Sequence, residues 1–480
     1  MATAKVVPLN VELVHGLNGR VASAAVSLTA AAVVVKIVAT LKEFAVAGTY
    51  GRSAAMDAFL VAFLVPNLLI NLIAESMNQA LVPTLIRVRI EQGKVRAQEL
   101  LSSSMLSLCI LLTAAMLITG VVARGIFPLL GSGFGAGKLD LTLHLFYGLL
   151  PVVLLSGIAS SCTAVLNSVG KFALPAVAPM VMPVSVMAGA LLLHGRFGIW
   201  GLVDATILGS LLHASIVAGM MNRRAYRFRL QWAGKTAATR EVIRQYGPVL
   251  LSSVVASGGL IADQGLAAML PVGSVSALVF AGRFVSVIVS LLGGAVSSAV
   301  APHFSILVAQ RDWQGCRETM RTWARLTAMV SVPLAVGLIS GSHWLVQVTL
   351  QHGVFGPRDT AAVATVMGMY AIQIPFFAVS RVYYRFVIAM RRSDLVFYCG
   401  GANLILDIAL DLLLMRWIGV AGIALATSIW CMSTLVFLWY AARHLLSEVS
   451  RDPGPGDPEW DGLRGATCQV ARETTSGTNE

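Results

Sequence analysis

Residues 56–86 read MDAFLVAFLVPNLLINLIAESMNQALVPTLI. This run is long enough to cross the hydrocarbon core of a bilayer, which takes about 20 mainly apolar residues in an α-helix. Its only charged residues are Asp57 and Glu75. The run therefore predicts a transmembrane helix, and Pro66 in its middle should bend that helix.

The rest of the 480-residue chain has the same character. It is 57% hydrophobic and 12% charged, with a mean hydropathy of +0.78, which a soluble domain does not sustain in water. The net charge of +12 is carried largely by short loops between apolar runs, which favours cytoplasmic loops over a nucleic-acid surface. The six cysteines show neither zinc-ligand spacing nor a disulfide framework. We therefore expect membrane lipids as surroundings and no nucleic-acid partner.

Apolar runs bounded by charge, glycine or proline predict an all-α integral membrane protein of about twelve transmembrane helices. We place these helices at 21–46, 56–86, 99–124, 141–167, 173–194, 198–222, 245–269, 275–307, 321–350, 360–389, 394–415 and 418–444.

The loops at the two ends of these helices differ in charge. With the N-terminus inside, the inner loops hold Arg87, Arg89, Lys94, Arg96, Lys171, Arg223, Arg224, Arg227, Arg229, Lys235, Arg240, Arg244, Arg311, Arg317, Arg321, Arg325, Arg391 and Arg392. The outer loops hold Arg52, Arg124, Lys138, Arg196, Arg358 and Arg416. Because basic residues accumulate in cytoplasmic loops, both termini are predicted to lie in the cytoplasm.

The basic cluster at 223–244 divides the helices six and six. A faint repeat supports this division, since a gapless alignment of 56–86 on 275–307 pairs Ala58 with Ala277 and Pro83 with Pro302. We predict a six-helix half over 1–222, a basic cytoplasmic linker over 223–244 and a second six-helix half over 245–446. The segment 447–480 has too little apolar content to form a core and is predicted to be a disordered cytoplasmic tail.

Two lysines lie inside the first predicted helix. A charge at mid-bilayer costs roughly 2.5 to 3.5 kcal/mol on insertion scales, so Lys36 and Lys42 should face a partner or a wet cavity. They differ by about 120° around the helix and about 9 Å along it, so their stems can reach one cavity from different heights. The alternative for Lys42 is that it extends to the membrane surface beside Glu43.

A polar row is expected along the second helix. Asp57 and Glu75 are five helical turns apart, and Asn71, Asn78 and Gln79 lie within about 60° of the same line. Such a row would line a cavity, although Asn and Gln also serve as polar contacts between helices.

The eighth helix carries an arginine at the start of a row of small or polar residues. The row comprises Arg283, Ser286, Ser290, Gly293, Gly294 and Ser297. Close helix packing would explain the serines and glycines but not the arginine. A guanidinium matches phosphate geometry, so Arg283 with Lys36 and Lys42 indicates an anionic, phosphorylated ligand. Asp57 and Glu75 could balance this charge when the site is empty.

A second group of residues is acidic. Asn403 and Asp407 share one helix face, and Asp263 belongs to the seventh helix. Their oxygens suit a small cation or a proton relay, or they could pair with neighbouring hydroxyl or basic groups. Since no catalytic triad, phosphate-binding glycine loop or histidine cluster stands out, we expect a transporter and not an enzyme.

The sequence resembles the MurJ (MviN) lipid II flippase family of the multidrug/oligosaccharidyl-lipid/polysaccharide (MOP) exporter superfamily. The resemblance covers roughly residues 30–445. Its most specific part is MDAFLVAFLVPNLL at 56–69, continued by QALVP at 79–83; further matches are VLN at 165–167, KFALPAVAP at 171–179, GP at 247–248 and QHG at 351–353.

The resemblance implies roles for particular residues. Lys36 and Lys42 match two basic positions of the family's first helix, Asp57 its helix-two aspartate and Arg283 its helix-eight arginine. Some members of the family have a sodium site, and this chain resembles that site at Asp263, Asn403, Asp407 and Thr427.

Three departures from the family concern the substrate. Ile70 and Asn71 stand where arginines are usual, Gly282 stands where an acidic residue often precedes the arginine, and the usual two extra C-terminal helices are absent. With these departures the expected substrate is an anionic lipid-linked glycan, lipid II or a similar lipid-linked oligosaccharide.

The resemblance therefore implies a bacterial cytoplasmic-membrane flippase that moves an undecaprenyl-pyrophosphate-linked glycan by alternating access. Sodium or protons could couple the transport, no other cofactor is expected, and we expect a monomer. The alternatives are a flippase of an exopolysaccharide or O-antigen intermediate, and a multidrug/cation antiporter of the same superfamily. Three basic groups in the cavity disfavour the antiporter.

Overall fold

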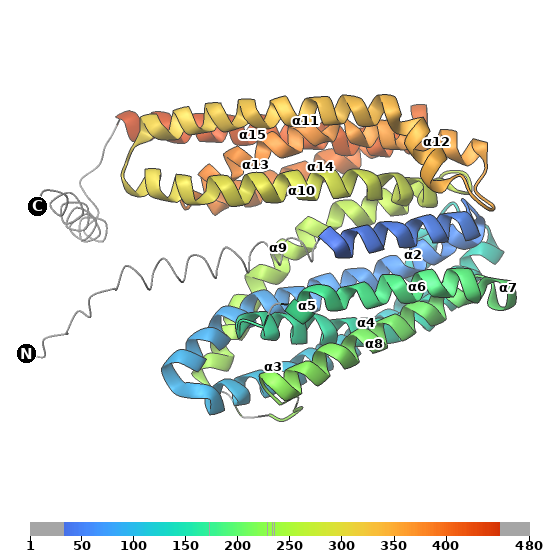
Figure 1. The fold of residues 1–480 in the computed structure, drawn as a ribbon, viewed down its shortest axis with the longest axis horizontal. Helices are drawn as coiled ribbons and strands as arrows, with labels where there is room; N and C mark the ends of the chain where they lie inside the picture. Colours follow the sequence, from blue (N-terminus) through green and yellow to red (C-terminus); the bar gives the residue numbers. More distant parts are fainter. Residues whose placement is uncertain (1–32, 172, 228, 233, 235, 452–480) are drawn as a thin grey trace, which may run out of the picture. The chain divides into compact units, whose positions relative to one another are not determined.

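The computed structural model describes residues 33–171, 173–227, 229–232, 234 and 236–451. Every regular element in this part of the chain is a helix, which confirms the all-α prediction (Figure 1). The beginning of the first predicted helix, at 21–32, lies outside the described residues.

Ten helical runs in the described ranges are long and apolar enough to cross a membrane. The longest, Ala54–Leu130, turns at Gly93, where φ is 86°, and so contains the second and third predicted helices. A shorter helix over 33–50 is the described part of the first. The runs and this helix together correspond to the twelve helices expected from the sequence.

The first part of the chain forms the helix 33–50, α2 (Ala54–Leu69), the π-helix η1 (Ile70–Glu75), α3 (Ser76–Leu130), α4 (Ala136–Ser168), α5 (Ala173–Val177), the 3₁₀ turn η2 (Ala178–Met180), α6 (Val181–Leu192), α7 (His194–Phe197) and α8 (Trp200–Arg224). The remainder forms α9 (Ala237–Ala267), α10 (Ser274–Ala309), α11 (Trp313–Leu350), α12 (Pro357–Ala371), α13 (Gln373–Ala389), α14 (Ser393–Ile418) and α15 (Val420–Arg451).

Two predicted boundaries move because helices extend into polar sequence. The Thr236 hydroxyl accepts a hydrogen bond from the Thr239 amide at 3.1 Å, so α9 is capped and begins at Ala237, inside the predicted linker. The helix α15 continues to Arg451, so residues 447–451 of the predicted disordered tail are helical. Residues 452–480 lie outside the described part.

The first compact unit comprises residues 1–280 and 347–360. In it α4 packs against α2, α3 and α8, while α6 packs against α8 (Figure 1). The α6–α8 contact depends on small residues: a Cβ on Gly189 would overlap the Cβ of Ala205. Close approach of this kind is typical of helix packing in lipid, where apolar burial gives little advantage.

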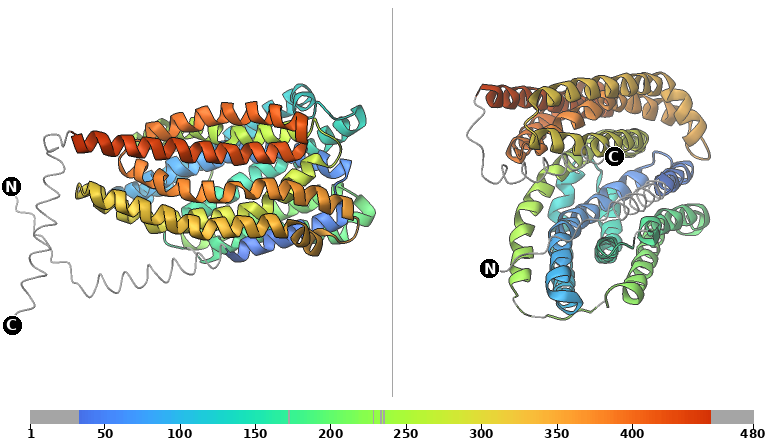
Figure 2. Two further views of the ribbon diagram at one scale, coloured as in Figure 1. Left: turned by 90° about the horizontal axis from the view of Figure 1, so that it is seen from above. Right: turned by 60° about the vertical axis from the view of Figure 1, so that its left-hand side comes forward.

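The second compact unit comprises residues 281–346 and 361–480. Its helices α13, α14 and α15 pack together, and Figure 2 shows them with α10 and α11 in the yellow-to-red part of the chain. Phe304 of α10 and Phe386 of α13 meet in its core with ring centroids 5.5 Å apart. A Cβ on Gly293 would meet the Phe377 ring at 2.9 Å, so α10 and α13 also rely on a small residue.

The boundary between the compact units differs from that of the predicted halves. The helix α9 belongs to the first unit because it packs along α3, with the Ser76 hydroxyl donating to that of Ser253 at 2.9 Å. The division into 1–222, 223–244 and 245–446 was based on charge and a sequence repeat, and it stays a prediction.

Candidate transport site

A π-helix interrupts the second membrane helix where the polar row was expected. The π-helical turn Ile70–Glu75 begins four residues after Pro66. In such a turn the hydrogen bonds run from i to i+5, so the register of every later side chain shifts. Asp57 is 1% exposed, whereas Glu75 is exposed. The two carboxylates therefore differ in burial, although both contact α4, Asp57 at Lys138 and Glu75 at Ser160.

The residues after the π-helix contact α4 through a chain of hydrogen bonds. The Asn78 amide donates to the Ser160 hydroxyl at 2.8 Å, and that hydroxyl donates to Glu75 Oε1 at 2.5 Å. Ser161 donates to Asn78 Oδ1 at 2.8 Å. Asn78 is thus a polar contact between helices, the alternative left open by the sequence, while Asn71 and Gln79 are exposed.

Asp57 joins three elements of the first unit. Its Oδ2 lies 3.0 Å from the Lys138 ammonium of α4 and accepts from the Gly273 amide at 2.7 Å. Its Oδ1 accepts from the Ser276 amide, in the first turn of α10, at 2.9 Å. A carboxylate at a helix N-terminus is stabilised by free amides and by the helix dipole. The structure thus gives Asp57 an anchoring role that the sequence did not reveal.

The same end of the unit holds the loop after α11 against the first helix. The Val354 amide donates to the Gly48 carbonyl at 2.9 Å. Gly353 has a φ of 61°, and a Cβ there would overlap the Gly48 carbonyl oxygen, so this position of the QHG motif requires glycine. Arg52 donates to the Gly273 carbonyl at 2.9 Å and pairs with Asp359 at 3.5 Å.

The two predicted lysines differ in their surroundings. Both are half-buried on the helix 33–50. Lys42 pairs with the buried carboxylate of Glu43 at 2.8 Å. Lys36 pairs with no acid among the residues the structure describes. A half-buried, unpaired ammonium is the better placed of the two to receive an anion.

Arg283 lies on an exposed face of α10. Ser286, Ser290 and Gly294 are exposed on the same helix, whereas Gly293 and Ser297 are buried. The row therefore divides into packing residues and an exposed polar face that contains Arg283. Lys36 and Lys42 belong to the first unit and Arg283 to the second.

The acidic group contains a residue that the sequence analysis overlooked. Asp407 and Asp411 of α14 are both buried, and their carboxylate oxygens lie within 4.8 Å of each other. Asp407 Oδ1 accepts no hydrogen bond from the described residues. Two close buried carboxylates repel unless a cation or proton intervenes, so the donors fit a small cation. The sequence offered one signal for Asp411: it lies four residues after Asp407, which places both carboxylates on one helix face.

The other predicted members of the acidic group have individual roles. The Asn403 amide donates to Thr434 at 2.8 Å, and its oxygen accepts from Ser433 at 3.1 Å, which ties α14 to α15. Thr427 donates to its own helix at the Ile423 carbonyl. Asp263 is buried on α9 in the first unit.

Two arginines inside a membrane helix were also overlooked. Arg381 and Arg385 belong to α13, and Arg381 lies over the Phe377 ring, 4.2 Å from its centroid. Arg385 lies 5.8 Å from the Tyr384 ring centroid. Each is a charge within an apolar run, which is the signal that Arg283 also gives, so both could have been found from the sequence.

Comparison with known proteins identifies relatives over most of the helical region. The family model described as "Lipid II flippase MurJ" matches residues 46–450. The probable lipid II flippase MurJ of Vibrio cholerae is 23% identical over 442 residues, covering 89% of this chain and 84% of that protein.

Two solved structures show the same fold. A lipid II flippase MurJ in an inward closed conformation has a TM-score of 0.75 at 20% identity, covering 90% of this chain and 94% of that chain. An inward-facing multidrug resistance MATE family transporter of the MOP superfamily has a TM-score of 0.74 at 12% identity, covering 88% of this chain and 96% of that chain.

Proposed function

Because the chain belongs to the MurJ lipid II flippase family, we propose that it moves an undecaprenyl-pyrophosphate-linked glycan across the membrane by alternating access. As a member of this family it is a transporter and not an enzyme, and a multi-pass protein of the bacterial cytoplasmic membrane. The family match over residues 46–450 is the observation that carries the proposal.

The basic residues would recognise the pyrophosphate. Lys36 and Lys42 are half-buried on one helix and Arg283 is on an exposed polar face, so all three are accessible to a ligand within their own units. Cationic donors to phosphate make hydrogen bonds roughly twice as strong as neutral ones. Asp57, buried and bonded to Lys138 and α10, is assigned to the scaffold in this proposal. Glu75, held by Ser160, would border the path.

The identity of the glycan is the finer part of the proposal. Purified protein in vesicles would be offered lipid II and an O-antigen-type undecaprenyl-pyrophosphate sugar in parallel. We expect lipid II to be translocated. If only the O-antigen-type lipid moved, the chain would be a flippase of that lipid. Ile70 and Asn71, which stand where the family usually has arginines, would then be the first positions to change to arginine. Movement of neither would refute the proposed function.

A small cation would bias the transport cycle through Asp407, with Asn403 and Thr427 of the same unit as further members of the proposed sodium or proton site. Asp263, which belongs to the first unit, stays a prediction from the sequence. A ligand shifts a conformational equilibrium only through different affinities for its states. We expect Asp407→Asn, which keeps the shape and removes the charge, to abolish stimulation of translocation by sodium or by a proton gradient at normal membrane abundance. An unchanged response to both ions would remove Asp407 from the coupling.

The proposed orientation places both termini in the cytoplasm. Single cysteines would be introduced at Arg229, Arg317 and Arg358, all exposed, in a variant that lacks the native cysteines. An impermeant thiol reagent added to intact cells should label the cysteine at 358 and spare those at 229 and 317. Labelling at 229 from outside would invert the assignment.

A further inference from the structure

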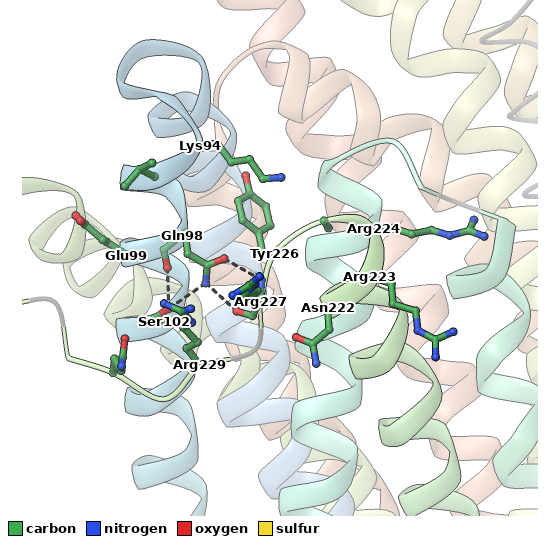
Figure 3. Close-up of a pocket in the computed structure, with 13 residues that line it drawn as sticks. Lys94, Gln98, Glu99, Ser102, Asn222, Arg223, Arg224, Tyr226, Arg227 and Arg229 are labelled. Carbon is green, nitrogen blue, oxygen red and sulfur yellow. Dashed lines mark hydrogen bonds between the residues drawn. The ribbon is translucent and has the colours of Figure 1, made fainter.

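A basic hollow of about 610 Å³ lies in the first unit, between α3, the end of α8 and the loop that follows it (Figure 3). Its described lining contains five cationic side chains and one acid, Glu99, which pairs with Arg96 at 2.8 Å. The five cations are Lys94, Arg223, Arg224, Arg227 and Arg229. Their mutual repulsion is unfavourable unless an anion joins them.

The wall of this hollow has a defined geometry. The side-chain amide of Gln98 on α3 donates to the Arg227 carbonyl at 2.8 Å and accepts from the Arg227 amide at 2.9 Å. Figure 3 shows both bonds, together with the contact of Gln98 to Ser102 at 3.1 Å. The loop is therefore fixed to α3 through its backbone, and this leaves the Arg227 guanidinium available to a ligand.

Tyr226 also lines the hollow, and its hydroxyl is buried. Tyr226 is 2% exposed, and its hydroxyl oxygen has no hydrogen-bond partner among the described residues. Burial raises the pKa of Tyr226, although nearby Arg89 opposes the shift, so the phenol keeps its proton and can donate. An unsatisfied buried hydroxyl costs free energy, which an oxyanion in the hollow would recover.

The position of the hollow indicates a lipid. Lys94 begins the second crossing of α3 after the turn at Gly93, and Arg224 is in the last turn of α8, so the hollow is at the ends of two membrane spans. Apolar side chains are exposed beside the cations: Val95 is 73% exposed, Leu230 48% and Trp232 52%. Basic residues next to exposed apolar and Trp side chains are typical of surfaces that contact lipid headgroups.

We propose that this hollow binds the phosphate of an anionic phospholipid from the leaflet at that end of the helices. Lys94, Arg227 and Arg229 would contact the phosphate, Tyr226 would donate to one of its oxygens, and the exposed apolar residues would contact the acyl chains. The site is separate from the transport residues, and it does not depend on which glycan the protein moves.

The test measures binding of fluorescent phosphatidylglycerol to the full-length protein in phosphatidylcholine nanodiscs. We expect saturable binding, and about tenfold weaker binding after Lys94→Gln with Arg227→Gln. The matched control, Arg240→Gln with Arg244→Gln, removes the same charge from exposed positions of α9 outside the hollow, and its effect should stay below about twofold.

Two substitutions that leave the net charge unchanged distinguish a defined binding site from nonspecific attraction to a positive surface. Gln98→Met frees the loop and Tyr226→Phe removes one hydroxyl, and each should weaken binding about fivefold with normal thermal stability. Equal losses in the hollow and control pairs, or full binding in both uncharged variants, would overturn the proposal. Inorganic phosphate or pyrophosphate that binds as tightly as the lipid would also overturn it, in favour of a soluble anion.

Discussion

Replacing Arg283 with glutamine should lower the rate of glycan-lipid translocation in vesicles by about tenfold to a hundredfold. Hydrogen bonds to charged groups contribute about 1.5 to 3 kcal/mol, and glutamine removes the charge while keeping most of the volume. Arg283→Lys keeps the charge but loses the planar fork, so a smaller loss is expected. Lys36→Gln should resemble Arg283→Gln, because Lys36 has no acidic partner among the described residues.

The control for charge alone is Arg416→Gln, which alters an exposed arginine at the end of α14 in the same unit. Its translocation rate should equal that of the parent. Lys36→Arg and Lys42→Arg restore the side chain usual in the family and should be tolerated. The anion-binding assignment would fail if Arg283→Gln and Lys36→Gln both flipped substrate at the parental rate with normal membrane abundance.

Removing the charge of Asp57 should cause a large loss of thermal stability of the folded protein. Breaking a buried ion pair by removing one partner costs about 3 to 5 kcal/mol, since the other charge stays buried. Asp57→Asn would leave the Lys138 ammonium uncompensated and remove the charged cap of α10. We expect the detergent-solubilised variant to lose the size-exclusion peak of the folded protein after heating to a markedly lower temperature than the parent.

Two variants would test the cause of this loss. Asp140→Asn removes an exposed acid two residues from Lys138 on the same helix and should leave thermal stability unchanged. Asp57→Asn combined with Lys138→Gln removes both charges and should recover part of the loss, because no unpaired charge remains buried. A double variant as unstable as the sum of its single variants would show that the ion pair is not the reason.

The sequence alone determined the class of the protein and its family. Lipid as a solvent imposes long apolar runs, so composition and hydropathy located the helices without any knowledge of their packing. The same constraint made each intramembrane charge conspicuous, as with Lys36 and Arg283. The local motif at 56–69 identified the family, because its residues are contiguous.

Only the tertiary structure decided what those charges contact. The partner of Asp57 is 81 residues away at Lys138, and the helix it caps begins more than 200 residues later, a pairing that no local pattern encodes. The π-helix at Ile70–Glu75, which no sequence pattern predicted, interrupts the membrane helix between Asp57 and the residues that follow Glu75. Likewise, Lys94 and Arg227 line one hollow because Gln98 of α3 holds the backbone of the loop after α8, a contact between segments far apart in the sequence. Periodicity specifies which residues share a helix face, whereas packing between distant segments determines which of those faces meet.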